Sequence, residues 1–355
     1  MGKPDVAIVG LGPAGSLMAW KAAESGYNVK AYDIQKTYTK PCGDAITVKE
    51  EYEDLLRKSE SIDGIVTRHI IEVSGYGSRI IEHGSPAWYI VDKTRLVGYF
   101  REQALSHGAE IVYRAVDPNV ELGNVVVDAR GPYAHVAVKD SYIMTYRVFV
   151  KVDSWDNDTA LLSFETEKSG LAWIFPSYRG ENIVNAGGGL KGESLSRVKD
   201  YVKNFLKKHF GNTVEIIEEK AAPIAVYSEV EPVTNGIIRI GEAGGLINSA
   251  GGEGIRMALI SALHAFNSLS HEDPVKAYLK LVKPLVKESL LTRRLLRSVE
   301  RVEARRASRL LYNLPEVFWR EFLRGNMSYL LLFKSFIVKP RIGVEALRVL
   351  LSSRS

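Results

Sequence analysis

The chain begins with a pattern of apolar and polar residues that predicts a strand, a glycine turn, a helix and a second strand. Residues 5–9 form a short apolar run of the kind found in buried parallel strands. The turn GLGPAG (residues 10–15) follows, then a helical segment to about Ser25, and then an apolar strand over residues 28–32 that ends at Asp33. This order of elements is typical of a dinucleotide-binding βαβ unit.

Each glycine of this turn has a separate expected task. Gly10 permits the tight turn, Gly12 lets the backbone approach a pyrophosphate, and Gly15 lets the helix pack closely on the strand. The N–H groups at the start of the helix then face the phosphates. Asp33 is placed to accept hydrogen bonds from the ribose hydroxyls of an adenosine. The sequence therefore predicts a dinucleotide site.

The alternation of strands and helices is interrupted after Asp33. The chain continues with the loop KPCGDA (residues 40–45) and an acidic stretch over residues 49–60. Two later segments, 124–131 and 236–268, restore a strand followed by a glycine turn, and the second also contains an apolar helix. We therefore expect the nucleotide-binding part to be assembled from separated segments.

The residues between these pieces alternate apolar and polar side chains at a period of two. This pattern predicts an antiparallel sheet with one face toward a cavity. The expected strands cover residues 70–75, 79–83, 143–152, 160–165, 171–176 and 182–186. The aromatic residues that could wall such a cavity, or belong to an ordinary core, are Trp88, Tyr89, Phe164, Trp173 and Phe175.

In combination, several motifs resemble the geranylgeranyl reductase family of flavoproteins, which includes the digeranylgeranylglycerophospholipid reductases. The resemblance covers about residues 4–270. Its motifs are GLGPAG (10–15), KPCGDA (40–45), YIVDKTRL (89–96), VVVDARGP (125–132), AWIFP (172–176) and GEAGGLINSAGGEGI (241–255). It implies FAD as the cofactor and the FAD fold of p-hydroxybenzoate hydroxylase.

The resemblance implies an α/β fold, in which a Rossmann-like FAD-binding domain is interleaved with an antiparallel-sheet substrate domain and followed by C-terminal helices. The FAD-binding domain is expected from residues 1–62, 91–138 and 222–273, the substrate domain from 63–90 and 139–221, and a basic helical region from 274–355.

The resemblance also implies which residues form the site. Those implied to bind FAD are Gly10, Gly12, Ala14, Gly15 and Asp33 at the ADP half, Val116 at the adenine, Cys42, Gly43, Ala45 and Lys93 near the flavin, and Glu242, Gly254 and Ile255 along the ribityl chain and ring. Trp173, Phe175 and Pro176 belong to the motif that contacts the substrate. Relatives have Pro and Tyr where this chain has Lys168 and Leu171, which leaves the exact substrate open.

Chemistry makes Cys42 the candidate catalytic residue. An isolated prenyl alkene is not electrophilic, so a hydride from reduced flavin must be accompanied by a proton, in a cavity that excludes water. Cys42 is the single cysteine of the chain and lies in the loop that the resemblance places beside the flavin. The alternative is that Cys42 is a small buried apolar residue.

Charge is distributed unevenly along the chain. Residues 274–355 contain 18 Lys or Arg and 6 Asp or Glu, a balance of +12, although the whole chain carries only +5. Leu291, Leu295, Val299 and Val302 have helical spacing there, which favours basic amphipathic helices at an anionic membrane surface. The alternative is a solvated charged face over an ordinary helical core. The chain has no nucleic-acid motif and no ligand spacing among its 7 His.

The expected function is saturation of C=C bonds in the prenyl chains of a membrane lipid or quinone by an FAD-dependent reductase. The electron donor stays open between ferredoxin and NAD(P)H. The alternatives are an FAD-dependent monooxygenase or halogenase of the same fold, and a non-catalytic flavin or lipid-binding electron-transfer protein. The single cysteine and the absence of a long apolar run predict a cytoplasmic protein, with peripheral contact at the inner face of the cell membrane.

Overall fold

A computed structural model describes residues 5–135, 137–138, 140–211, 214–340 and 342–343. Its largely parallel sheet has the strand order β15-β16-β9-β1-β2-β8. The strands are β1 (Val6–Val9), β2 (Val29–Asp33), β8 (Glu110–Tyr113), β9 (Val125–Asp128), β15 (Val233–Thr234) and β16 (Ile237–Arg239). Of their pairings, only β15 with β16 is antiparallel. This sheet brings together chain segments that the interrupted sequence pattern had separated.

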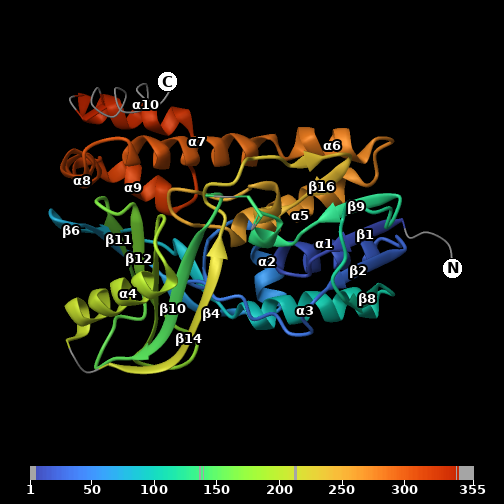
Figure 1. Ribbon diagram of the computed structural model, residues 1–355, viewed down its shortest axis with the longest axis horizontal. Coiled ribbons are helices and arrows are strands. Elements are labelled where there is room, and N and C mark those ends of the chain that lie inside the picture. Colours follow the sequence, from blue (N-terminus) through green and yellow to red (C-terminus); the bar gives the residue numbers. More distant parts are fainter. Residues whose placement is uncertain (1–4, 136, 139, 212–213, 341, 344–355) are drawn as a thin grey trace.

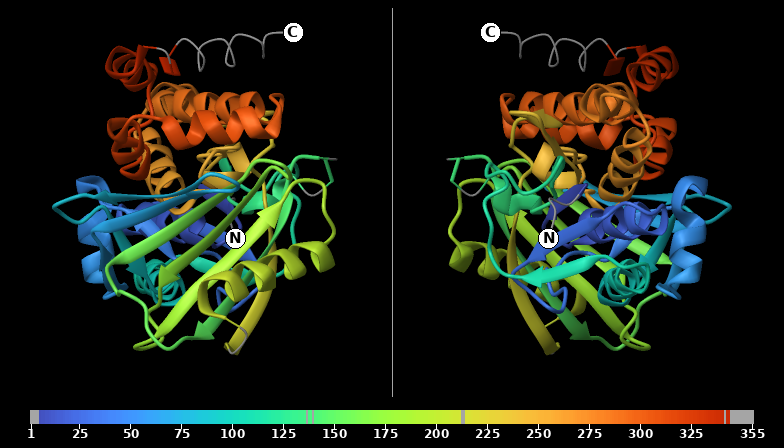
Figure 2. Two further views of the ribbon diagram at one scale, coloured as in Figure 1. Left: turned by 90° about the vertical axis from the view of Figure 1, so that its left-hand side faces the viewer. Right: turned by 90° about the vertical axis from the view of Figure 1, so that its right-hand side faces the viewer.

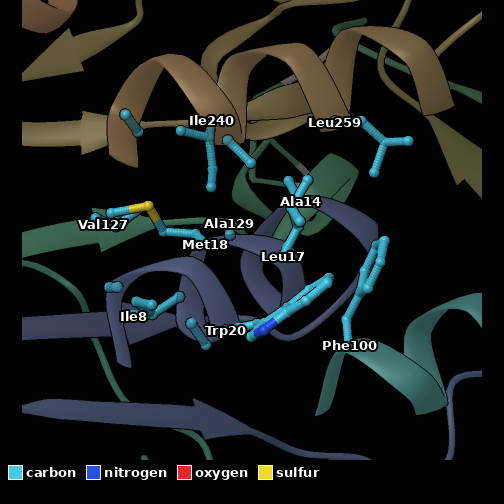
Figure 3. Packing of buried hydrophobic residues seen from close by; sticks show 14 of the residues in the cluster. Ile8, Ala14, Leu17, Met18, Trp20, Phe100, Val127, Ala129, Ile240 and Leu259 are labelled. Carbon is cyan, nitrogen blue, oxygen red and sulfur yellow. The ribbon is translucent and has the colours of Figure 1, made fainter. Parts of the chain in front are cut away.

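Helices α1 (Pro13–Glu24), α3 (Lys93–Ser106) and α5 (Ile255–Ser268) pack with this sheet around one apolar core. Leu17 and Trp20 of α1 lie between Phe100 of α3 and Leu259 of α5 (Figure 3). All four are almost completely buried. Because α1 is apolar nearly all round, its start is held firmly at the edge where β1 ends.

A second, mostly antiparallel sheet has the order β14-β10-β13-β12-β11-β5-β6, in which only β11 and β5 pair in parallel. Its strands are β5 (Arg68–Val73), β6 (Gly77–Glu82), β10 (Ile143–Lys151), β11 (Thr159–Glu165), β12 (Gly170–Pro176), β13 (Ile183–Leu190) and β14 (Glu215–Ile224). Helix α4 (Leu195–Phe210) covers one face of this sheet (Figures 1 and 2).

Smaller elements join the two sheets. Strands β3 (Ala45–Thr47), β7 (Trp88–Val91) and β4 (Ile62–Val66) form a short antiparallel sheet, and helix α2 (Glu50–Lys58) follows β3. The 3₁₀ turns η1 (Gly131–Ala134) and η2 (Gly241–Gly244) follow β9 and β16. The loop KPCGDA therefore leads directly into β3, at the junction of both sheets.

The C-terminal part folds back over the second sheet, on the face opposite α4 (Figure 1). It consists of α6 (Pro274–Leu281), α7 (Lys283–Glu300), α8 (Ala304–Asn313), α9 (Glu316–Leu323) and α10 (Tyr329–Val338). Phe318, Trp319 and Phe322 of α9 share one buried cluster with Trp173 and Phe175 of β12. These helices therefore complete the core around the second sheet.

The expected fold class is confirmed, since both sheets and the C-terminal helices are present. Each expected strand of the second sheet exists, with ends shifted by a few residues. Strands β8, β14 and β15 and the small sheet of β3, β7 and β4 were not predicted, because β14 lacks a regular alternation of apolar and polar residues and most of the others are short. The boundaries of the two domains stay a prediction.

Candidate active site

The two sheets and the C-terminal helices enclose a cavity of ≈ 830 Å³. One end is formed by the glycine turns after β1 and β16, and the other by the face of the second sheet that α7, α8 and α9 cover. All the predicted site residues line this cavity except Gly15 and Pro176. The fold therefore gathers residues from positions as far apart as Gly10 and Ile255.

The glycine turn has the shape that a diphosphate needs. Gly10 has φ +95°, and a Cβ there would lie 2.6 Å from the carbonyl oxygen of Ala129. A Cβ at Gly15 would lie 1.9 Å from the carbonyl oxygen of Gly10, so Gly15 serves close packing below the cavity. A Cβ at Gly12 would meet only the Tyr38 ring, at 3.4 Å.

Gly12 is also the N-cap of α1, and as a glycine it has no side chain that could bond to the first N–H groups of the helix. The first N–H groups of a helix have no partner within the helix, so those of α1 are available to an anion in the cavity. The turn thus combines room for a ligand with unused donors and a positive helix end. By this test, the residues present fit the pyrophosphate of FAD.

Asp33 is held by its own chain at this end of the cavity. Its Oδ2 accepts hydrogen bonds from the Leu11 amide at 2.6 Å and from the Arg101 guanidinium at 3.2 Å, and its Oδ1 accepts from the Gln35 amide at 2.8 Å. A carboxylate has about four acceptor positions, so a ribose hydroxyl can still bind. Sequence reasoning missed Arg101, whose place in α3 carries no motif.

Glu242 belongs to the 3₁₀ turn η2 after β16, and it lines the cavity. Its Oε2 lies 2.8 Å from the ammonium of Lys40, and its Oε1 accepts a hydrogen bond from the Ala225 amide at 2.6 Å. Burial alone lowers the pKa of Lys40, but the charge of Glu242 raises it overall, so Lys40 stays protonated. Gly254, the N-cap of α5, makes no side-chain capping bond, and Ile255 follows it. The N-terminus of α5 therefore faces the cavity beside this ion pair.

Cys42 belongs to a buried polar cluster. Its Sγ lies 3.4 Å from Oδ1 of Asp44 and accepts a hydrogen bond from the Asp44 amide at 3.1 Å. Asp44 has φ +58°, a left-handed conformation that Asp adopts more readily than most residues. This turn folds the carboxyl group back toward the thiol. Burial raises the pKa of Cys42, while the nearby charge of Lys93 opposes this effect.

Lys93 supplies the positive charge of the cluster. Its Nζ lies 3.4 Å from Asp44 Oδ1 and donates a hydrogen bond to the Lys40 carbonyl at 3.0 Å. Burial alone lowers the pKa of Lys93, but the Cys42, Tyr38 and Asp44 groups raise it overall. For Asp44, burial raises the pKa and Lys93 opposes the shift. The thiol thus lies in a buried site beside a fixed ammonium and a carboxyl group.

Asn185 of β13 fixes this cluster to the second sheet. Its amide nitrogen donates to the Cys42 carbonyl and to Asp44 Oδ2, both at 2.9 Å, while its oxygen accepts from the Trp173 indole at 3.1 Å. The β12–β13 register places Asn185 opposite Phe175. A Cβ at Gly43 would lie 2.5 Å from the Phe175 ring, so the loop needs glycine there. Sequence reasoning missed both Asp44 and Asn185; Asp44 was visible within KPCGDA, but Asn185 had no signal.

Beyond this cluster, the cavity continues as an apolar chamber. Its wall residues from the second sheet are Ile143, Leu162, Phe164 and Leu171, and those from the C-terminal helices are Leu296, Val299, Leu311, Phe322 and Leu323. Of the aromatic residues considered for this wall, Trp88, Phe164, Trp173 and Phe175 line the chamber. Tyr89 does not, because it packs in the other core and bonds to Glu53.

Two arginines beside the glycine turns are engaged by acids. Arg130 lines the cavity but bonds to both oxygens of Asp128, at 2.9 and 2.8 Å. Arg256 is buried and bridges Glu253 of its own loop to Glu288 of α7. It therefore joins α5 to the C-terminal helices. Among the described residues, no group of three His, Cys, Asp or Glu is arranged to hold a metal ion.

Curated relatives are similar in sequence to this chain over most of its length. The digeranylgeranylglycerophospholipid reductase of Methanosarcina acetivorans is 26% identical over 316 residues, which cover 76% of each chain. Digeranylgeranylglycerophospholipid reductase 1 of Methanopyrus kandleri is 26% identical over 322 residues, 78% of this chain and 84% of that one. No family model matches the chain.

Solved structures share the fold. A geranylgeranyl bacteriochlorophyll reductase-like protein from Thermoplasma acidophilum has a TM-score of 0.77 at 17% identity, covering 98% of this chain and 99% of its own. A flavin-dependent brominase triple mutant has a TM-score of 0.70 at 15% identity, covering 95% and 99%. A halogenase mutant solved with FAD has a TM-score of 0.64 at 14% identity, covering 97% and 86%.

The chain therefore has the fold of FAD-dependent oxidoreductases. The order of its strands, its glycine turns and its similarity to these solved structures all support this assignment. Its resemblance to the geranylgeranyl reductase family, expected from the motifs, is confirmed by the digeranylgeranylglycerophospholipid reductases that it matches. Among the described residues, no helix is long and apolar enough to cross a membrane.

Proposed function

We propose that this protein is an FAD-dependent reductase that saturates C=C bonds in the prenyl chains of a membrane lipid. The observation that carries the proposal is the continuity of one cavity, from the glycine turn through Cys42 to the apolar chamber. An elongated apolar chain fits the chamber, and a dinucleotide fits the turn. A quinone with a prenyl tail meets the same requirements and stays a second substrate class.

In this proposal FAD is held by the residues that the resemblance implied. Gly10, Gly12, Ala14 and the start of α1 receive the pyrophosphate, and Asp33 and Val116 receive the adenosine. Glu242, Gly254, Ile255, Gly43, Ala45 and Lys93 line the remainder of the cavity and would contact the rest of the cofactor. When bound there, reduced FAD would supply the hydride equivalent that balances the proton given by this chain.

Cys42 holds that proton. Because burial raises the pKa of its thiol, Cys42 stays protonated near neutral pH and donates from Sγ to an alkene carbon. The Lys93 ammonium, attracted to Asp44 at 3.4 Å, then stabilises the thiolate that remains. Asn185 orients the Asp44 carboxyl group, and Trp173 in turn orients Asn185. The aromatic walls exclude water from a carbon centre that is electron-poor during transfer.

A flavin monooxygenase or halogenase is the competing class, because solved neighbours of the same fold include a brominase. The two classes differ in what they consume. The test is to incubate dithionite-reduced protein with a geranylgeranylated lipid without oxygen and to measure the lipid mass. A reductase adds two hydrogens for each bond saturated. Unchanged lipid under these conditions, together with substrate-dependent oxygen uptake in air, would overturn the proposal. A protein that does neither is a flavin carrier.

The electron donor stays open between ferredoxin and NAD(P)H in the proposal. We also propose a cytoplasmic protein that contacts the inner face of the cell membrane peripherally, because a prenyl lipid must leave the bilayer to reach the chamber. The positive balance of residues 274–355 supports this location.

A further inference from the structure

The outer side of α6 and α7 carries charge of one sign. All of residues 274–300 are described, and every exposed charged side chain among them is a cation. The two acids of this segment turn inward: Glu288 pairs with the buried Arg256, and Glu300 lies 2.6 Å from Lys191. The exposed cations of α6 and α7, together with the residue that follows α7, are Lys276, Lys280, Lys283, Lys287, Arg294, Arg297 and Arg301. We name this set the basic stripe.

The stripe follows one face of α7. Residues 283, 287, 294, 297 and 301 recur at helical spacing, so their side chains lie along a single line. An 18-residue helix is about 27 Å long, which gives the stripe the length of a docking surface rather than a point contact. Arg297 reaches Glu229 at 3.5 Å, but Glu229 is itself 71% exposed and neutralises only one end.

The opposite face of α7 lines the apolar chamber. Leu296 and Val299 point into the cavity, and Leu291 is almost completely buried. The apolar positions that the sequence suggested for membrane contact, Leu291, Leu295, Val299 and Val302, are therefore buried or partly buried within the protein. One helix thus separates the substrate chamber from the basic stripe.

Exposed apolar side chains lie next to this stripe, on α10. Tyr329, Leu330, Phe333, Ile337 and Val338 are each more than half exposed, while Leu331 and Leu332 pack into the protein. The Arg294 guanidinium of the stripe donates a hydrogen bond to the Tyr329 hydroxyl at 3.2 Å, so the two surfaces meet. Figure 1 shows α10 and α7 together at the side of the molecule opposite α4.

We propose that the basic stripe and the exposed face of α10 form one surface that docks on an anionic lipid bilayer and turns the chamber toward it. Cations attract the lipid phosphates, while Phe333 and Ile337 enter the apolar boundary below the headgroups. A second copy of this chain is the other possible occupant, but seven cations on each copy would then face one another. The charge of the surface therefore favours lipid over self-association.

The test uses the full-length protein and vesicles of phosphatidylcholine, alone or mixed equally with phosphatidylglycerol. In one variant, called the α7 variant, Lys280 at the end of α6 and Lys283 and Lys287 of α7 are changed to Gln. The matched control changes Arg197, Lys203 and Lys207 of α4 to Gln, which removes the same charge from exposed positions on the far side of the molecule. Flotation is measured at about 0.01 M and about 1 M salt, where the screening lengths differ about tenfold.

We expect wild type to float with the mixed vesicles at low salt. Each cation near the surface strengthens binding about fivefold, so the α7 variant should bind roughly 100-fold more weakly, while the α4 variant stays close to wild type. Phe333→Ser with Ile337→Ser should remove the binding that persists at high salt, because only the apolar contact resists screening. Thermal unfolding checks that each variant is folded.

Equal losses in the α7 and α4 variants would overturn the proposal, because the effect would then follow net charge alone. So would a wild-type dimer that the α10 variant converts to a monomer without any change in flotation. The inference rests on the proposed function only in its orientation of the chamber. Because flotation needs no prenyl substrate, docking can fail while lipid reduction stands, and the reverse.

Discussion

The glycine turn after β1 and the wall formed by α7 and α9 border the same cavity, but they arise in opposite ways. The turn is local: Gly10 to Gly15 and Asp33 lie within one βαβ unit, and a Cβ at Gly10 or Gly15 would collide with backbone atoms. The wall includes Leu296 and Phe322, which lie far along the chain from the last strand of the second sheet, β14 (Glu215–Ile224). A cofactor site can therefore be recognised from sequence where a substrate chamber cannot.

This difference predicts different sensitivities. The turn tolerates almost no added atom, because it meets a rigid ligand at the backbone. The chamber is bounded by flexible apolar side chains and should respond gradually to changes of volume. The Cys42 cluster lies between the two and should affect the reaction rather than binding.

The largest effect is expected at Gly12. Gly12→Val places a side chain where only the Tyr38 ring lies nearby, so the protein should fold but exclude the pyrophosphate. We expect colourless protein that gains no flavin absorbance on reconstitution. Gly98→Ala, in open space on α3, is the control and should be yellow. Flavin retained by Gly12→Val would remove the glycine turn from the site.

At Cys42, the reaction should slow while the cofactor stays. Cys42→Ser keeps the size of the side chain but is a much weaker acid, so saturation of the alkene should slow by about 10²–10⁴-fold. Flavin absorbance and reduction by dithionite should be unchanged, and Cys42→Ala should behave like Cys42→Ser. Wild-type turnover in both variants would leave Cys42 as a packing residue.

A smaller change is expected in the chamber wall. Leu296→Trp fills space on the inner face of α7, so kcat/KM for a prenyl lipid should fall by at least about tenfold, with flavin content unchanged. Leu105→Trp is the control, because Leu105 is exposed on α3 and does not line the cavity. Equal activity of the two variants would place the substrate elsewhere.

Acid should act on the second sheet through His69 of β5 and His83 of β6, whose ring nitrogens lie 3.0 Å apart. Burial lowers the pKa of His69 well below its usual range, and lowers that of His83 to about 4. Below about pH 6.5 the unfolded chain therefore binds more protons than the folded one. We expect the free energy of unfolding to fall from pH 6.5 toward pH 4, by about 1.4 kcal/mol per pH unit for each histidine.

His83→Gln should make this pH dependence shallower, whatever its effect on stability at pH 7. Denaturant unfolding at several pH values gives the slope directly. A slope as steep as that of wild type would show that other groups cause the acid sensitivity.

The sequence could predict features whose signals lie within one short segment, but not contacts between distant segments. Strands β1, β2, β9 and β16, helices α1 and α5 and the glycine turns were predictable, because strand, turn and helix signals are local. Asn185 was not predictable, because its contact with the KPCGDA loop depends on the register between β12 and β13. The role of α7 was equally hidden: its apolar spacing suggested either a membrane-surface helix or an ordinary core helix, whereas Leu296 and Val299 line the chamber.

The ion-pair partners of individual residues could not be predicted from local sequence patterns either. Asp33 was predicted as a ribose ligand, but its bond with Arg101 depends on how α3 packs against α1. Arg256 is buried and pairs with Glu253 of its own loop and with Glu288 of α7. Arg101 and Glu288 each belong to a segment distant from their partner, which no spacing rule indicates.

The central claim, that one cavity joins a flavin to a prenyl chain beside Cys42, is tested most directly by anaerobic flavin reoxidation. Protein reduced with a single equivalent of dithionite is mixed with a geranylgeranylated lipid, and flavin absorbance and lipid mass are followed together. The account predicts that the oxidised spectrum returns without oxygen, with one C=C bond saturated for each flavin reoxidised. A flavin that stays reduced until oxygen enters, with the lipid unchanged, would contradict it.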